Sequence, residues 1–134
     1  MEAILKVDIK ELAREYRDYV ISLRRHFHQY PELSLEEFET SKKIKEELEK
    51  MGIEYVSAGG TGVIKGSKPG KTIALRADMD ALPVEELTEC AFKSKIDGNM
   101  HACGHDSHMA MLLGAAKILN GMRDQINGTV RLIF

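Results

Sequence analysis

The sequence of 134 residues predicts one domain of the α/β class. Three stretches place apolar residues at helical spacing, and four short apolar runs bounded by glycine or proline are typical of strands. The last helical stretch lies between two of these runs. Helices and strands mixed along one chain favour an α/β architecture.

The composition is that of an ordinary globular protein, with 43% apolar and 30% charged residues. A net charge of −2 and the lack of a basic cluster argue against a nucleic-acid partner. Cys90 and Cys103 do not form a disulfide framework, which favours the cytoplasm. Met1–Lys10 carries acidic residues and no long apolar run, so we expect no signal peptide and no membrane span.

The first helix is expected from Asp8 to Tyr30. Asp8 followed by Glu11 is a capping-box signature, and Pro31 ends the helix because proline disfavours helical backbone at the residue before it. The basic and histidine side chains of Arg24–His28 complement the negative end of the helix dipole, so we interpret them as solvated capping groups. The apolar face is expected to be Ile9, Leu12, Tyr16, Val20, Leu23 and Phe27.

A second helix is expected between Ser34 and Gly52. Ser34 with Glu37 repeats the capping-box signature, and glycine is a common helix end. The lysines and glutamates in between are interpreted as a solvated face. The inward side chains are expected to be Phe38, Ile44, Leu48 and Met51.

Two short strands are expected at 53–57 and 63–66, joined by a glycine-rich turn at 58–62. Because the turn does not match a phosphate-binding loop, no nucleotide site is predicted. Lys68–Lys71 has proline and glycine where a type II turn needs them. The apolar run at 72–77 that follows fits a buried strand.

Two carboxylates, Asp78 and Asp80, come directly after that run. Open α/β sheets place their chemistry at the carboxyl ends of strands, so both are candidate site residues. The alternative is an aspartate-rich turn before Pro83. The pair Glu85–Glu86 is interpreted as solvated, and 91–99 as a polar surface loop.

The segment Met100–His108 concentrates the candidate metal ligands of the chain. Cys103 and His105 are two residues apart, so in extended backbone their side chains point the same way. Gly104 between them leaves room for a close bend. A thiolate with an imidazole suits zinc, cobalt or nickel better than magnesium or calcium. The pair supplies only part of a site, because a catalytic zinc has about three protein ligands.

A structural reading of the same segment remains open. Free cysteine often behaves as a small buried apolar residue, which would explain Cys103. His101 and His108 would then be solvated or hydrogen-bonded surface residues.

A third helix is expected after Gly104, capped by Asp106 and ended by Asn120–Gly121. A strand at 129–134 follows, and the sequence ends within it, which suggests a truncation. The apolar stripe of the helix is expected to be Met109, Leu112, Leu113, Ala116 and Leu119.

Taken together, Arg76–Pro83, Met100–Asp106 and Gly128–Phe134 resemble, in this order, motifs of the metal-dependent amidohydrolase/carboxypeptidase family. The resemblance is narrower to the branch of hippurate hydrolase, N-acyl-amino-acid amidohydrolases and hydrolases of auxin–amino-acid conjugates. Residues within Arg24–Ser34 also resemble that branch's N-terminal helix and turn.

The resemblance implies a zinc-peptidase-like, three-layer α/β/α catalytic domain with a mixed, mainly parallel sheet. Residues 1–134 would be the N-terminal part of that domain. The dimerisation or lid domain and the C-terminal half would lie outside the chain, and the parent protein would be a homo-oligomer.

The resemblance also implies one or two divalent ions per site, either zinc, cobalt, nickel or manganese. Cys103 corresponds to a bridging thiolate ligand and His105 to a terminal imidazole ligand. In wider relatives a metal-binding histidine stands at position 78, oriented by the aspartate at position 80. Here Asp78 replaces that histidine, which leaves Asp80 as a supporting catalytic residue.

The implied reaction is hydrolysis of the amide bond of small N-acyl-amino acids such as hippurate, releasing a carboxylic acid and an amino acid. In the family, the general-base glutamate follows the strand that ends here at Phe134. One alternative is a truncated, non-catalytic chain that binds metal weakly or only interacts. Another is a dipeptidase or a hydrolase of aminobenzoyl conjugates.

Overall fold

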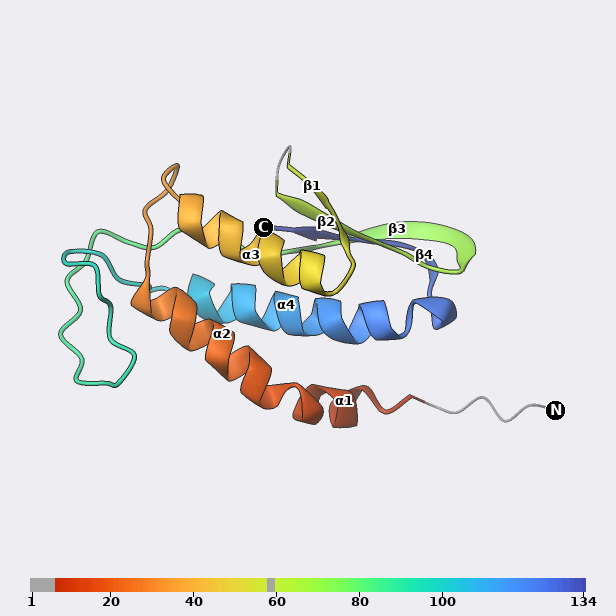
Figure 1. Cartoon of the computed structure of the whole chain (residues 1–134), viewed down its shortest axis with the longest axis horizontal. Helices are drawn as coiled ribbons and strands as arrows, with labels where there is room; N and C mark the ends of the chain where they lie inside the picture. Colours follow the sequence, from red (N-terminus) through yellow and green to blue (C-terminus); the bar gives the residue numbers. More distant parts are fainter. Residues whose placement is uncertain (1–6, 58–59) are drawn as a thin grey trace.

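A computed structural model describes residues 7–57 and 60–134. In these ranges the chain forms helices and a four-stranded sheet (Figure 1). The helices are α1 (Ile9–Glu15), α2 (Arg17–Gln29), α3 (Phe38–Lys50), α4 (His105–Gly121) and the short 3-10 helix η1 (Arg123–Gln125). The strands are β1 (Glu54–Val56), β2 (Thr61–Lys65), β3 (Lys68–Arg76) and β4 (Asn127–Ile133).

The sheet is mixed, as expected, with the strand order β1-β2-β4-β3. β3 and β4 are parallel and connected through α4, whereas β1–β2 and β2–β4 are antiparallel. Antiparallel pairing therefore outnumbers parallel pairing in the described residues. Only the β3–β4 pair has the long crossover connection that parallel strands require.

The helices lie on one face of the sheet (Figure 1). The core fills the space between them and the sheet, with Ile44 and Leu48 of α3, Leu113 of α4, and Ile64 and Leu132 of the sheet buried. The opposite face of the sheet bears no helix in the described part of the chain. The α/β class is thus confirmed, with two of the three expected layers described. No helix in the described ranges is long and apolar enough to cross a membrane.

The single helix expected from Asp8 to Tyr30 is in fact two helices that meet at Tyr16. The Asp8 cap is confirmed, because its carboxylate accepts from the backbone N–H groups of Lys10 and Glu11. The prediction of one continuous helix was wrong because α4 also contacts this segment. The ammonium of Lys117 in α4 lies 5.2 Å from the ring centre of Tyr16, and the bend at Tyr16 keeps α1 in contact with α4.

Helix α3 begins later than expected, and Ser34 does not cap it. Its cap comes from Glu32, whose carboxylate accepts from the backbone N–H groups of Glu39 at 3.1 Å and Thr40 at 2.6 Å. Phe38 was expected inward but is 73% exposed, because it is the first residue of the helix and lies beyond the edge of the core. Ile44 and Leu48 are buried as expected.

The segment Lys68–Lys71 does not form the expected turn. It is the start of β3, with an irregular register against β4 between Lys68 and Thr72. Gly70 permits this because a Cβ there would lie 2.6 Å from the backbone of Asn127. Of the glycine-rich turn at 58–62, residues 58 and 59 lie outside the described ranges, and the rest leads into β2.

The strand at 72–77 exists but is not buried as expected. Among the described strands, β3 lies at the edge of the sheet and pairs with β4 alone. Ile73 is 56% exposed although it is in register with the buried Val130 of β4. The apolar sequence therefore reflects a strand whose surfaces are not covered within the described residues.

Candidate metal centre

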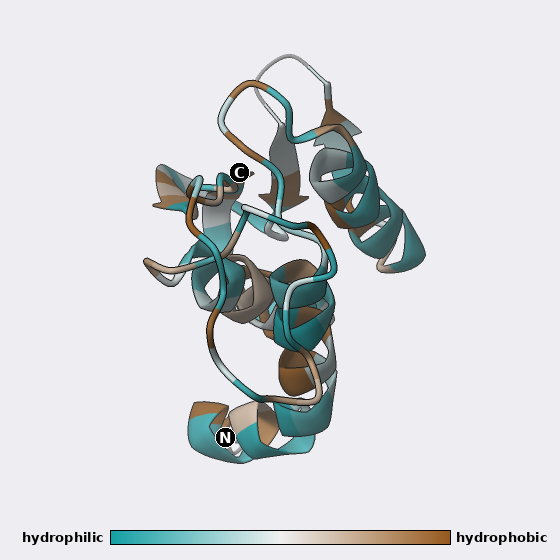
Figure 2. Ribbon diagram, turned by 90° about the vertical axis from the view of Figure 1, so that its left-hand side faces the viewer, coloured by the Kyte–Doolittle hydropathy of each residue, from teal (hydrophilic) through white to brown (hydrophobic). Residues whose placement is uncertain are grey.

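The candidate ligands lie where three loop segments meet, at the carboxyl end of β3 and the amino end of α4. Ala81 donates its backbone N–H to the carbonyl of Glu32 at 2.8 Å. The next residue, Leu82, exchanges two backbone hydrogen bonds of 3.0 Å with Met100. These bridges bring Asp80 to the segment that holds the Cys-x-His pair. Figure 2 views the molecule from this end, with the loops in front of the helices.

His105 is the first residue of α4, and Asp80 holds its ring. Nδ1 of His105 lies 2.8 Å from the backbone carbonyl oxygen of Asp80 and 3.0 Å from its carboxylate Oδ1. Both oxygens are acceptors, so Nδ1 carries the proton and donates. The lone pair of a neutral ring is then on Nε2, which is the tautomer needed to bind a metal through that nitrogen.

Asp78 lies apart from this contact. Its carboxylate pairs with the Arg76 guanidinium at 2.7 Å, and its side chain is nearly half exposed. The resemblance assigns to Asp80 the role of orienting the residue at position 78. In the structure Asp80 holds His105 instead.

Cys103 has an exposed free thiol, so it is not the buried apolar residue of the alternative reading. Gly104 has φ +129°, a backbone conformation that favours glycine and that turns the chain into α4. Within residues 7–57 and 60–134, no group of three or more His, Cys, Asp or Glu side chains is arranged to hold a metal ion. The pair of Cys103 and His105 would be a partial donor set, and its role as metal ligands stays a prediction.

His101 is buried, contrary to the surface reading. It is 4% exposed, and neither ring nitrogen has a hydrogen-bond partner among residues 7–57 and 60–134. The pKa of His101 is lowered to about 4, mainly by burial and in addition by His28 and His105, while Asp106 and Asp80 oppose the shift. The ring is therefore neutral near pH 7. His108 is exposed, and its ring centre lies 6.0 Å from that of His105.

Behind the candidate ligands lies a buried charge network that the sequence did not reveal. Asp106 is not the cap of α4 but a buried residue in its first turn. Its Oδ2 receives a hydrogen bond from Nδ1 of His28 at 2.7 Å and forms an ion pair with Nε of Arg24 at 3.0 Å. His28, expected to be a solvated helix-end group, is 3% exposed. The expectation failed because the partners come from helices far apart in sequence.

Glu86 completes this network, although it was expected to be solvated. It is 2% exposed, and its Oε1 accepts from Nε2 of His28 at 2.9 Å and from the backbone N–H of Ser94 at 2.9 Å. The Thr88 hydroxyl donates to its other oxygen. Burial alone would raise the pKa of Glu86, but these hydrogen bonds outweigh it and hold the pKa below its ordinary value.

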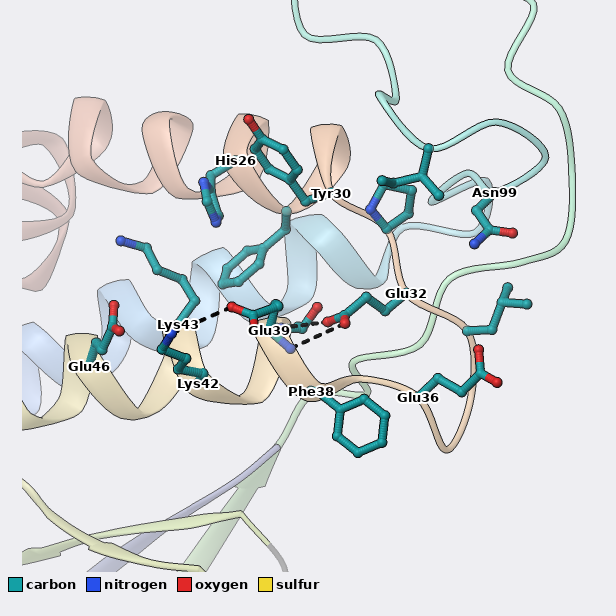
Figure 3. A pocket seen from close by; sticks show the side chains of 15 residues that line it. His26, Tyr30, Glu32, Glu36, Phe38, Glu39, Lys42, Lys43, Glu46 and Asn99 are labelled. Atoms are coloured by element: carbon teal, nitrogen blue, oxygen red, sulfur yellow. Dashed lines mark hydrogen bonds and ion pairs between the residues drawn. The ribbon is translucent and has the colours of Figure 1, made fainter.

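A cleft of about 730 Å³ lies between the end of α2 and the start of α3 (Figure 3). Its walls include Tyr30, Phe38 and Lys43, and none of Asp80, Cys103 and His105 lines it. Burial, with a smaller contribution from Lys43, lowers the pKa of His26 in this cleft. The cleft is therefore separate from the candidate metal centre.

Comparison with known proteins places these motifs in one family. The model of peptidase family M20/M25/M40 matches residues 74–134. The chain is 56% identical over 131 residues to thermostable carboxypeptidase 1 of Saccharolobus solfataricus, covering 94% of this chain and 33% of that protein. It is 47% identical over 133 residues to an N-acyl-L-amino acid amidohydrolase of Geobacillus stearothermophilus, covering 96% of this chain and 36% of that protein.

A solved structure agrees. The YXEP protein of Bacillus subtilis, described as a dinuclear metal binding peptidase from the M20 family, superposes with a TM-score of 0.86 at 46% identity. The match covers 90% of this chain and 35% of that one. The chain thus spans about a third of the length of the relatives it matches. With its motifs, its fold and these identities in agreement, the chain belongs to peptidase family M20/M25/M40.

Proposed function

We propose that the protein containing this chain is a metal-dependent hydrolase that cleaves the amide bond of N-acyl-amino acids. The observation that carries the proposal is the His105 ring, whose Nδ1 is held by two oxygens of Asp80. The names of its relatives support amide or peptide hydrolysis in general. The finer choice, a hippurate-like acyl group, rests on the motif resemblance.

The residues present fit a divalent ion such as zinc, cobalt, nickel or manganese. Cys103 offers an exposed thiol, and His105 is held in the tautomer that leaves Nε2 unprotonated. The description of the B. subtilis relative as dinuclear supports more than one ion. When bound, a divalent metal supplies Lewis-acid polarisation of the amide carbonyl and of the attacking water.

The chain's own residues act by position. Asp80 fixes the tautomer and rotation of the His105 ring through two contacts. Gly104 sets the turn that separates the thiol from the imidazole. The proton carrier is proposed to be a glutamate beyond Phe134, as the resemblance implies, because a water that attacks an amide must lose a proton and the leaving amine must gain one.

The test compares Cys103→Ser with Cys90→Ser in the intact protein. Metal content is measured by elemental analysis, and hydrolysis is measured with an N-acyl-amino acid. We expect Cys103→Ser to lose metal and activity together, because serine replaces the thiolate ligand. Cys90→Ser, the matched control, should keep both, because a serine hydroxyl can replace the weak 3.8 Å hydrogen bond that Sγ of Cys90 donates to Oε2 of Glu86. Metal and activity retained by Cys103→Ser would refute the proposal.

A second candidate function is cleavage of the C-terminal residue from a peptide. The relative at 56% identity is named a carboxypeptidase, which favours it. Rates for a peptide and for an N-acyl-amino acid, measured on the same preparation, decide between the two.

A further inference from the structure

Two buried carboxylates and one buried imidazole lie directly behind the candidate metal centre. The His28 ring lies between Asp106 and Glu86, each of these three residues is at most 3% exposed, and Arg24 makes a further ion pair with Asp106. Three parts of the chain therefore meet here: helix α2, the loop 85–94 and the first turn of α4.

The hydrogen bonds of this network fix its charges. Both nitrogens of the His28 ring face carboxylate oxygens, and a carboxylate can only accept. A ring that donates from both nitrogens is an imidazolium. The network then holds two anions and two cations, so the cost of burying each charge is offset by a partner at hydrogen-bond distance.

The loop 85–94 is anchored to α2 by a second kind of contact. Phe92 of this loop packs edge-on against the His28 ring with centres 5.6 Å apart. The guanidinium groups of Arg24 and Arg25 lie 4.9 Å and 5.1 Å from the centre of the Phe92 ring. Together with the hydrogen bond between Glu86 and His28, these contacts join the loop to α2.

The position of Asp106 connects this network to the candidate ligands. Asp106 follows His105 directly at the start of α4. Successive side chains of a helix point about 100° apart, so the two residues hold the first turn from different sides. Asp80 holds His105 on one side, and His28 holds Asp106 on the other. The N-cap residue Gly104 has no side chain that could cap α4, so these contacts and the hydrogen bond from the backbone N–H of Ser107 to Oδ1 of Asp106 restrain its amino end.

We propose that His28 and Glu86 are positioning residues of the metal centre. Glu86 holds the His28 ring, and His28 holds Asp106. Through Asp106 they fix the rotation of the first turn of α4 and so the places of His105 and Cys103. The inference rests on the proposed function, because it assumes that His105 and Cys103 bind a metal.

The test uses two substitutions of His28 in the intact protein. In His28→Asn the side-chain amide nitrogen stands near the place of Nδ1, so the hydrogen bond to Asp106 is retained. In His28→Gln it stands near the place of Nε2, so the hydrogen bond to Glu86 is retained and that to Asp106 is lost. The two variants remove the same positive charge and differ in which partner remains.

The readout is titration of the metal-free protein with Co²⁺, followed by the thiolate-to-cobalt charge-transfer band that reports Cys103. We expect His28→Gln to weaken Co²⁺ binding by about 10- to 100-fold, the effect typical of lost outer contacts to metal ligands, and to change the band. His28→Asn is expected to lose less Co²⁺ affinity than His28→Gln. Glu86→Gln, which keeps an oxygen for the ring, is a milder probe if a His28 variant does not fold, and we expect a weakening of several-fold.

The matched control is Glu47→Gln. Glu47 is also a buried carboxylate with charged partners, but it lies with Asn120 and Gly121 near the far end of α4. The Glu47→Gln variant should leave Co²⁺ affinity and the charge-transfer band unchanged. If wild type, both His28 variants and Glu86→Gln bind Co²⁺ equally well, the inference is overturned and the proposed function is not. The same holds if Glu47→Gln loses as much Co²⁺ affinity as His28→Gln. A wild-type protein without the Cys103 band would refute the proposed function as well.

Discussion

At the scale of single residues, the two contacts between Asp80 and His105 determine what the site can do. The backbone carbonyl of Asp80 accepts from Nδ1 of His105, and its carboxylate Oδ1 lies 3.0 Å from the same nitrogen. Loss of the carboxylate would leave the carbonyl contact, and with it the tautomer. The carboxylate adds charge, which makes the ring a stronger donor to a metal.

Replacement of Asp80 should therefore weaken metal binding without abolishing it. For Asp80→Ala we expect about a 10-fold loss of metal affinity, at the lower end for such contacts. Asp80→Asn should lose less metal affinity, since the side-chain amide oxygen can still accept from Nδ1 of His105. Competition with a chromophoric chelator measures both. A complete loss of metal in Asp80→Ala would contradict the argument and point to direct ligation by Asp80.

Local spacing was enough to select Cys103, His105 and Asp80 as candidates, and their metal and catalytic roles remain predictions. The partners of His28 were not predictable in this way. Its hydrogen bonds reach across 58 residues to Glu86 and 78 residues to Asp106. At the ends of polar helices and in polar loops, such residues have the same local pattern as solvated ones.

At the scale of elements, the contact between α2 and α4 depends on a glycine. A Cβ at Gly114 of α4 would lie 2.6 Å from Cγ2 of Val20 in α2. Gly114→Ala would gain about 1 kcal/mol of helix propensity but pay more than that in overlap, about 1–3 kcal/mol.

We therefore expect Gly114→Ala to lower the free energy of unfolding by about 1 kcal/mol. Val20→Ala removes Cγ2, the atom that the new methyl group would overlap. The double variant should therefore be about 1 kcal/mol more stable than the two single effects, added together, predict. Denaturant unfolding of the four proteins measures this coupling. Additive effects would show that the helices move apart to accept the methyl group.

A second polar cluster ties α3 to α2. Glu47 accepts from Lys43 and Lys50, each at 2.9 Å, and from the Tyr19 hydroxyl at 3.0 Å. Burial would raise the pKa of Glu47, but these hydrogen bonds outweigh it and lower the pKa from 4.5 to about 2. The folded state therefore favours the ionised carboxylate.

This cluster should make α3 sensitive to acid. The pKa of Glu47 is lower in the folded state than in the unfolded state. The contribution of Glu47 to the free energy of unfolding is therefore complete above pH 4.5 and is lost as the pH falls towards 2. Because the lysines are partly solvated, we expect only about 1 kcal/mol of local stability. Amide hydrogen exchange in α3, corrected for intrinsic rates, should differ between wild type and Glu47→Gln at pH 7 and converge near pH 2. A constant difference would contradict the assignment.

The existence and type of most elements followed from periodicity, whereas their ends depended on distant groups. Residues of α3 have the expected spacing, but Glu32, outside the helix, supplies the cap. The apolar run 72–77 predicted a strand correctly. Its exposure depends on the place of β3 in the sheet, which periodicity does not report.

At the scale of the whole molecule, the described chain has one covered and one open sheet face (Figure 1). The open face carries side chains such as Arg131 of β4, which is exposed. The outer edge of β3 is not paired with another described strand. An unpaired edge of this length, with Ile73 exposed beside it, is a template for pairing with another strand.

The 134-residue chain prepared alone should therefore self-associate through β3. We expect its apparent mass in analytical ultracentrifugation to rise with concentration, because two such edges satisfy each other's backbone groups. Ile73→Lys places a charge at the edge and should reduce this association, whereas Met111→Lys, at an exposed apolar residue of α4, should not. Equal association of both variants would show that the contact lies elsewhere, for example on the exposed turn around Leu35 and Phe38.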